Sequence, residues 1–234
     1  ETWDRATLET VQLARLKTTI QQASRAPFYA KRLAEAGVSA DNLRSLEDIR
    51  RIPFTSKDDL RSQYPYGLAT VPHSEFVRMH CSSGTTGTPV AVCYTQPDIN
   101  SWADLMARCL YMAGVRKDDV FQNMSGYGLF TGGLGIHFGA ERLGCMTIPA
   151  GAGNSKRQLK LVKDFGTTVA HILPSYALHL GTTLIEEGED PKALSLRIAC
   201  VGAEPYTEET RRRIEALFDM KVYNSYGLSE MNGP

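Results

Sequence analysis

Residues 1–75 carry apolar side chains at close to a helical spacing. No glycine or proline interrupts residues 4–23, where the apolar positions are Leu8, Val11, Leu13, Leu16 and Ile20. Pro27 ends this helix or begins the next one, and shorter helical patterns then alternate with Pro53 and Pro65. We therefore expect residues 1–75 to form a mainly helical lead-in segment that packs on the main sheet.

From Phe76 onward, short apolar runs rich in β-branched and aromatic residues alternate with helical stretches. The predicted strands are 76–80, 90–94, 119–124, 145–149, 168–173, 197–201 and 220–223. The predicted helices are 98–113, 133–143, 155–165, 175–187 and 207–218, with Ser155, Ser175 and Thr207 as N-caps and Gly114, Gly144 and Gly166 as helix ends. This alternation predicts an α/β fold for residues 76–234, with a mostly parallel sheet and flanking helices.

Composition and charge narrow the function classes. Lys plus Arg and Asp plus Glu both number 26, so no net field recruits nucleic acid or an anionic membrane. No apolar run reaches about 18 residues, so we expect neither a membrane span nor a signal peptide. The five cysteines lack Cys-x-x-Cys spacing, which favours reduced, buried thiols in a cytoplasmic protein.

The loop between the first two predicted strands is dense in hydroxyl side chains and glycine: Ser82, Ser83, Gly84, Thr85, Thr86 and Gly87. Such a loop can turn backbone N–H and side-chain O–H groups toward one point, which suits a polyphosphate. A Walker loop is excluded, because Thr88 follows Gly87 where lysine is required and Pro89 leads into a strand. A solvated turn is the alternative interpretation.

Four separated motifs accompany this loop: Ile52–Arg61, Gly126–Gly133, Gly202–Pro205 and Tyr226–Glu230. Together with the loop, and in this order, they resemble the adenylate-forming enzymes, and among these the phenylacetate–CoA ligases. The resemblance implies the large N-terminal domain of an adenylate-forming enzyme. It also implies that a hinge and a small C-terminal domain with a catalytic lysine lie downstream, so we expect this chain to be an N-terminal portion that is inactive by itself.

The resemblance assigns ATP and its metal to two of these regions. The loop residues Ser82 to Gly87 would grip the phosphates, and the hydroxyl of Thr85 or Thr86 would share Mg²⁺ with them. Glu230 would supply the carboxylate for that ion, which makes Thr85 and Glu230 the expected catalytic residues. Tyr226, Gly227 and Ser229 would line the nucleotide site; a helix-capping role is the alternative for Glu230.

The remaining motifs would hold the adenine and the acid. Gly202, Ala203, Glu204 and Pro205 would lie between the two ligands, where small residues let a flat ring approach the backbone; a plain strand-to-helix turn capped by Thr207 is the alternative. Tyr127 and Phe130 would form an aromatic wall for an aryl acid, although such rings are core filler about as often. His137 is expected to serve packing or the surface.

The expected function is ATP-dependent ligation of an aryl acid, phenylacetate or a close analogue, to coenzyme A through an acyl-adenylate. The cofactors and substrates would be ATP, Mg²⁺ and coenzyme A, and a homodimer is expected from the resemblance. A non-catalytic nucleotide-binding module is the alternative. A Rossmann oxidoreductase is excluded, because Gly126 and Gly128 do not continue into Gly-x-Gly-x-x-Gly.

Overall fold

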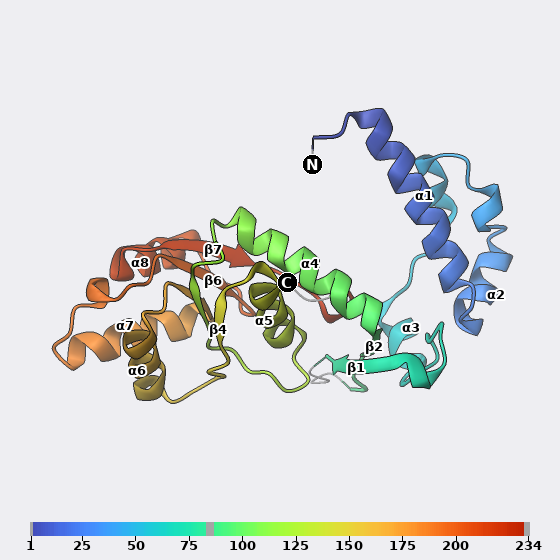
Figure 1. Ribbon diagram of the computed structural model, residues 1–234. Coiled ribbons are helices and arrows are strands. Elements are labelled where there is room, and N and C mark those ends of the chain that lie inside the picture. Colours follow the sequence, from blue (N-terminus) through green and yellow to red (C-terminus); the bar gives the residue numbers. More distant parts are fainter. Residues whose placement is uncertain (1, 83–86, 232–234) are drawn as a thin grey trace. The chain divides into compact units, whose positions relative to one another are not determined.

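A computed structural model describes residues 2–82 and 87–231 (Figure 1). The chain divides into two compact units, one of residues 1–79 with 83–93 and the other of residues 80–82 with 94–234. Among the described residues, no helix is long and apolar enough to cross a membrane. The two units are described separately below.

The first unit is mainly helical, as the sequence predicts. Its helices are α1 (Arg5–Ala23), α2 (Pro27–Glu35) and α3 (Lys57–Ser62), with 3₁₀ turns at Ala40–Asn42, Leu46–Arg51 and His73–Glu75. The carboxylate of Asp4 caps α1 by accepting from the backbone N–H of Thr7 at 2.7 Å. A small core of buried residues joins α1 and α2 to the following turn: Ile20, Leu33, Val38 and Leu43. Strands β1 (Phe76–Cys81) and β2 (Ala91–Thr95) pair with each other and carry the chain into the second unit.

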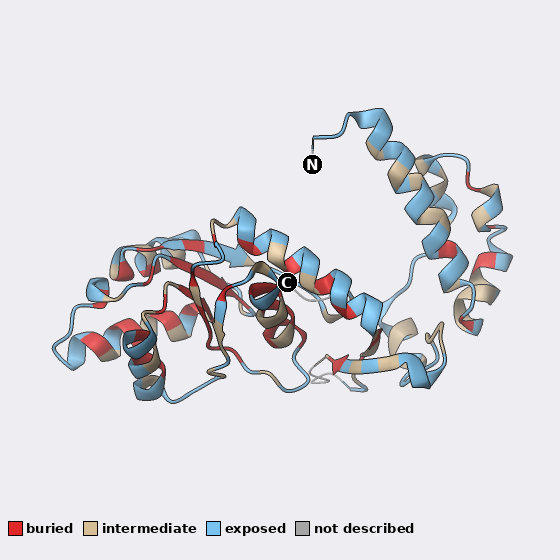
Figure 2. Ribbon diagram, in the orientation of Figure 1, coloured by how far each residue is buried: buried red, intermediate tan, exposed pale blue. Residues whose placement is uncertain are grey.

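A five-stranded parallel sheet forms the centre of the second unit. Its order is β4-β3-β5-β6-β7, and every pairing is parallel. The strands are β3 (Val120–Asn123), β4 (Met146–Ile148), β5 (Val169–Ile172), β6 (Ile198–Gly202) and β7 (Lys221–Ser225). All residues of β5 and β6 are buried (Figure 2), as expected for central strands whose two faces are both covered.

Five helices flank this sheet: α4 (Gln96–Met112), α5 (Thr131–Leu143), α6 (Ser155–Phe165), α7 (Pro174–Glu186) and α8 (Glu208–Phe218). Helices α6, α7 and α8 share one hydrophobic core with Ala199 and Val201 of β6. Helices α4 and α5 pack along each other (Figure 1). Gly135 permits this approach, because a Cβ there would lie 2.3 Å from the ring of Trp102. The predicted α/β fold is confirmed, and it brings the carboxyl ends of five strands to one edge.

Two of the three predicted N-caps are wrong. Helix α6 is capped by Asn154, whose side chain accepts from the backbone N–H of Arg157, so Ser155 is its first residue. Helix α7 begins at Pro174, so Ser175 lies inside its first turn. Thr207 caps α8 as predicted.

The predicted helix ends agree better with the structure than the predicted N-caps do. Gly144 and Gly166 are the C-caps of α5 and α6, both with a positive φ. Gly114 follows Ala113, the C-cap of α4, by one residue. Of the five cysteines, all free, Cys81, Cys145 and Cys200 are buried, whereas Cys109 is exposed, contrary to the expectation that all are buried.

Candidate functional site

A cavity of about 630 Å³ opens at the carboxyl edge of the parallel sheet in the second unit. Its wall consists of residues 130–132 at the start of α5, His171 of β5, residues 203–208 from the end of β6 to the first residue of α8, Arg211, and residues 224–229 at the end of β7 and beyond it. Ligands of open α/β sheets bind at this edge, because the loops that leave the strands converge there. Three of the sequence motifs thus contribute to one cavity.

The turn after β6 is built for close approach of the backbone. Gly202 pairs in register with Ser225 of β7, and a Cβ at Gly202 would lie 2.1 Å from the carbonyl oxygen of Ser225. Ala203 follows with a φ of 68°, a left-handed conformation that costs an L-residue roughly 1–2 kcal/mol. Ala203 and Pro205 line the cavity, and backbone strain of this kind clusters at functional sites.

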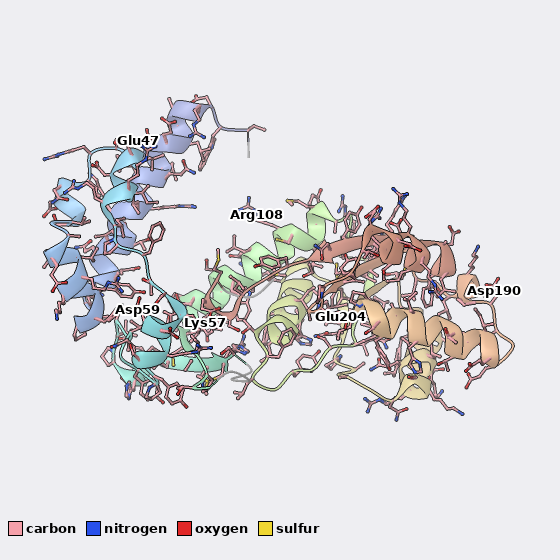
Figure 3. All side chains as sticks on the ribbon, turned by 180° about the vertical axis from the view of Figure 1, so that it is seen from behind. Glu47, Lys57, Asp59, Arg108, Asp190 and Glu204 are labelled. Atoms are coloured by element: carbon pink, nitrogen blue, oxygen red, sulfur yellow. The ribbon has the colours of Figure 1, made fainter. Side chains whose placement is uncertain are left out.

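Glu204 performs a structural task in addition to lining the cavity. Its Oε1 accepts a hydrogen bond of 2.6 Å from the backbone N–H of Ser175, in the first turn of α7. Figure 3 shows Glu204 beside the start of that helix. The carboxylate satisfies an N–H that has no partner within the helix and lies favourably at the positive end of the helix dipole. The sequence pattern gave no sign of this contact.

The segment after β7 is tied to α5. The hydroxyl of Thr131 donates to Oγ of Ser229 at 2.9 Å, and the hydroxyl of Tyr94 donates to the carbonyl oxygen of Ser229 at 3.3 Å. Tyr226 and Gly227 line the cavity, and the side chain of Tyr226 is free to stack on a ligand because the residue is 78% exposed. These contacts hold residues 226–229 against the start of α5.

Of the two predicted metal residues, Thr85 lies outside the described residues, so the structure gives a position for Glu230 alone. Glu230 lies in the short 3₁₀ turn Ser229–Met231 and is half-buried, but it is not part of the cavity wall. Among the described residues, no group of three or more His, Cys, Asp or Glu side chains could hold a metal ion. Mg²⁺ needs only one or two protein carboxylates beside the phosphates, so Glu230 stays a prediction.

Most of the predicted phosphate loop lies outside the described residues, which exclude Ser83, Gly84, Thr85 and Thr86. The flanking residues are described. Ser82 is half-buried at the end of β1, and Gly87 is exposed with a φ of 128°, a conformation that glycine adopts readily. The role of this loop stays a prediction.

The two aromatic residues predicted to hold the acid differ in position. Phe130 lines the cavity and is 43% exposed. Tyr127 does not line it; its hydroxyl lies 3.1 Å from Nδ1 of His137, whose Nε2 lies 3.1 Å from a carboxylate oxygen of Glu141. Burial raises the pKa of Tyr127. The structure therefore places only Phe130 at the cavity.

Sequence analysis missed His171. This residue ends up at the cavity wall, almost fully buried, with Nδ1 3.0 Å from Oδ1 of Asn123 and 3.1 Å from Oγ of Ser125. Burial lowers its pKa to about 4, so the ring is neutral at physiological pH. The available signal was a polar residue near the end of each of two apolar runs: Asn123 is the last residue of β3, and His171 is the residue before the last in β5.

An ion pair stands at the wall of the cavity as well. Arg211 donates to both carboxylate oxygens of Glu208, at 2.8 and 2.6 Å, and also to Glu215 at 2.7 Å. The bonds from Arg211 and Arg212 lower the pKa of Glu208 to about 2. The basic cluster at residues 211–213 is thus partly neutralised by its own helix.

The fold and the cavity define the class: an open parallel α/β protein with a cavity at the carboxyl edge of its sheet, the place where such folds bind ligands. Within that class, the chain belongs to the AMP-binding enzyme family, which matches residues 10–234.

Curated relatives that match this chain are ligases. The chain is 49% identical over 224 residues to the phenylacetate–coenzyme A ligase of Pseudomonas putida, covering 95% of this chain and 51% of that protein. It is 46% identical over 235 residues to the phenylacetate–coenzyme A ligase of Thermus thermophilus, covering 100% of this chain and 53% of that protein. A crystal structure of a 2-hydroxyisobutyryl-CoA ligase, in complex with 2-HIB-AMP and CoA, matches with a TM-score of 0.92 and 33% identity, over 99% of this chain and 51% of that one. The chain spans about half the length of the curated relatives it matches.

Proposed function

We propose that this chain is part of an enzyme that joins an aryl acid, phenylacetate or a close analogue, to coenzyme A at the expense of ATP. In the first step, a carboxylate oxygen of the acid bonds to the α-phosphorus and pyrophosphate leaves, which gives an acyl-adenylate. In the second step, the thiolate sulfur of coenzyme A bonds to the acyl carbon and AMP leaves with the oxygen that it received. The proposal rests on membership of the AMP-binding family together with the names of the relatives.

One observation carries the proposal. Residues from three motifs far apart in the sequence, 130–132, 203–205 and 226–229, line a single cavity at the carboxyl edge of the sheet. Reactions of this type depend on positioning and charge stabilisation more than on a covalent nucleophile. A cavity lined by aromatic residues (Phe130, Tyr206 and Tyr226), by the turn after β6 and by hydroxyl-bearing residues can place two flat ligands side by side.

The roles of the residues follow from their positions and chemistry. Gly202, Ala203, Glu204 and Pro205 lie between adenine and the acid, and Tyr226 stacks near the adenine. Phe130 faces the aryl ring. The contact between Thr131 and Ser229 keeps the acid wall and the nucleotide wall at a fixed separation.

The remaining residues would bind the phosphates of ATP and their metal ion. The loop residues Ser82 to Gly87 hold the phosphates through N–H and O–H groups. Glu230 and Thr85 would hold Mg²⁺, and the ion would supply positive charge against the phosphates. We further propose a homodimer in the cytoplasm; the free cysteines support a reducing compartment.

The test is pyrophosphate release by the protein at its full natural length, with ATP, Mg²⁺ and a panel of carboxylic acids. Phenylacetate or a close aryl acid should give the fastest release, and omission of the acid should abolish it. Equal rates with short aliphatic acids would contradict the aryl-acid assignment. Binding of ATP without any acid-dependent release would favour a nucleotide-binding module.

A further inference from the structure

Three polar side chains form a buried cluster at the carboxyl ends of β3 and β5. Asn123, Ser125 and His171 are all buried, and Asn123 pairs in register with His171. Oδ1 of Asn123 accepts from the hydroxyl of Ser125 at 2.8 Å, from the backbone N–H of Ser125 at 3.2 Å, and from Nδ1 of His171 at 3.0 Å. Buried polar groups in such a network constrain one another's protonation.

The network fixes which ring nitrogen of His171 carries the proton. Nδ2 of Asn123 donates to the carbonyl oxygen of Gly133 at 2.8 Å, so a flipped amide would set oxygen against oxygen there. Oδ1 therefore faces His171, and Nδ1 must carry a hydrogen to donate to it. The hydroxyl hydrogen of Ser125 is already given to Asn123, so Nδ1 also meets an acceptor in Oγ of Ser125.

A neutral imidazole carries one proton only, and burial keeps this ring neutral. Nε2 of His171 consequently holds a bare lone pair. Within the described part of the chain, both hydrogen bonds of the His171 ring are made by Nδ1. Some buried polar atoms of the described residues lack a hydrogen-bond partner, and Nε2 of His171 is not one of them. His171 lines the cavity and its Nδ1 is occupied by Asn123 and Ser125, so Nε2 is the ring nitrogen left to face the cavity.

A bare lone pair selects the kind of group that can lie against it. It attracts an O–H or N–H donor and repels a carboxylate or a phosphate, so it can hold neither the reacting carboxylate nor the polyphosphate. The cluster contacts the part of the molecule that carries Phe130, the residue proposed to face the aryl acid. Asn123 donates to the carbonyl oxygen of Gly133 in the first turn of α5, and this helix begins directly after Phe130.

We propose that Nε2 of His171 accepts a hydrogen bond from a hydroxyl or amino substituent on the ring of the aryl acid, and that the site thereby prefers aryl acids that carry such a donor. The inference rests on the proposed function, because it assigns the substrate class of the same cavity. His171 acts here as a specificity-determining residue, and Asn123 and Ser125 are positioning residues that fix its tautomer.

The experiment compares pairs of ligands of nearly equal shape. Binding of ortho-, meta- and para-hydroxyphenylacetate and of the matching methyl-substituted acids is measured by calorimetry with the protein at its full natural length. At one ring position, the hydroxyl compound should bind roughly tenfold tighter than its methyl counterpart, the value of one well-placed hydrogen bond.

The matched variants are His171→Asn and His179→Asn. An asparagine at 171 can still donate to Asn123 from near the position of Nδ1 but has no group at the position of Nε2. The ratio of the affinities for the hydroxyl compound and its methyl counterpart should therefore fall to about one. His179 is exposed on α7 and lies outside the cavity wall, so its variant should keep the preference. Thermal unfolding identifies a His171→Asn protein that fails to fold. If that variant does not fold, nitrogen NMR of the unsubstituted protein with labelled histidine replaces the binding measurement on the variant. The Nε2 signal of His171 should then shift when the hydroxyl compound binds and not when the methyl compound binds.

The outcomes separate the two levels of the proposal. If aryl acids bind but no ring position shows a preference for hydroxyl, or if His171→Asn retains the preference, the inference about His171 is overturned and the proposed function stands. Loss of ATP binding in His171→Asn with an unchanged acid preference would assign Nε2 to the adenine amine and also overturn it. If no aryl acid binds at all, the proposed function fails and the inference fails with it.

Discussion

Gly202 and Ser225 approach so closely that a methyl group on the α-carbon of Gly202 would lie 2.1 Å from the carbonyl oxygen of Ser225. The two residues are paired in register between β6 and β7. The Gly202–Pro205 and Tyr226–Glu230 motifs lie at the ends of these two strands, and the strands can lie this close only because residue 202 has no side chain. This contact relates the stability of the sheet edge to the shape of the cavity.

Gly202→Ala should consequently impair both stability and binding. Overpacking of this kind costs about 1–3 kcal/mol, since strands β6 and β7 must separate to admit the methyl group. Urea unfolding and ATP calorimetry measure the two effects. Gly126→Ala is the control for stability, because a Cβ at Gly126 would meet nothing within 4 Å. Equal unfolding free energies for the two variants would show that the close approach is not a constraint.

Phe130→Ala should weaken the binding of phenylacetate while ATP binding is retained. Removal of an aromatic wall costs roughly 1–2 kcal/mol of binding free energy, or about tenfold or more in affinity. Phe165→Ala is a matched control, because Phe165 on α6 is 48% exposed, close to the 43% of Phe130, yet lies outside the cavity wall. Parallel losses in both variants, or an equal loss of ATP affinity in Phe130→Ala, would remove Phe130 from the acid site.

Much of the fold was predictable because its signals are local. Helix α6 has the predicted bounds, 155–165, and the alternation of apolar strands and helices gave the parallel sheet. The N-cap of α6 was missed because Asn154 adopts a left-handed conformation, with a φ of 55°, that no residue pattern distinguishes from the neighbouring Ser155.

The site was less predictable, because it depends on contacts across the sheet. Tyr127 and Phe130 belong to the same motif, yet only Phe130 lines the cavity, since Tyr127 bonds to His137 on the adjoining helix. The role of His171 follows from its pairing with Asn123, a residue 48 positions earlier in the chain. Such a pairing exists only once the strand order is known.

The ion pair between buried Asp119 and partly exposed Arg197, at the opposite edge of the sheet, should matter for stability alone. Burial would raise the pKa of Asp119, but hydrogen bonds from Arg197, from the hydroxyl of Thr168 and from the backbone N–H of Arg116 outweigh it and hold that pKa below its ordinary value. Asp119→Asn should lower the unfolding free energy by about 2 kcal/mol, discounted because Arg197 is partly exposed. Asp118→Asn changes an exposed neighbour and should have little effect. A change in ligand affinity caused by Asp119→Asn would contradict the separation of this edge from the cavity.

The stability of the protein should decrease below neutral pH because of His171. Burial lowers its folded-state pKa from 6.5 to about 4, so the unfolded chain binds more protons between these values. The stabilisation is therefore fully present above the unfolded pKa and is lost as the pH falls toward about 4, on the order of 3 kcal/mol in total. Urea unfolding of the unsubstituted protein and of His171→Asn across this range isolates the effect. Parallel pH profiles of the two proteins would show that His171 is not buried in its neutral form.

The central claim is that a carboxylate attacks the α-phosphorus of ATP at this cavity, and the fate of one oxygen atom tests it directly. The protein at its full natural length is incubated with ATP, Mg²⁺, coenzyme A and phenylacetate whose carboxylate carries a heavy isotope of oxygen, and the nucleotide product is analysed by mass spectrometry. The account predicts AMP with one labelled oxygen, because the bridging oxygen of the acyl-adenylate stays with phosphorus when the thioester forms. Unlabelled AMP, or ADP as the product, would contradict it.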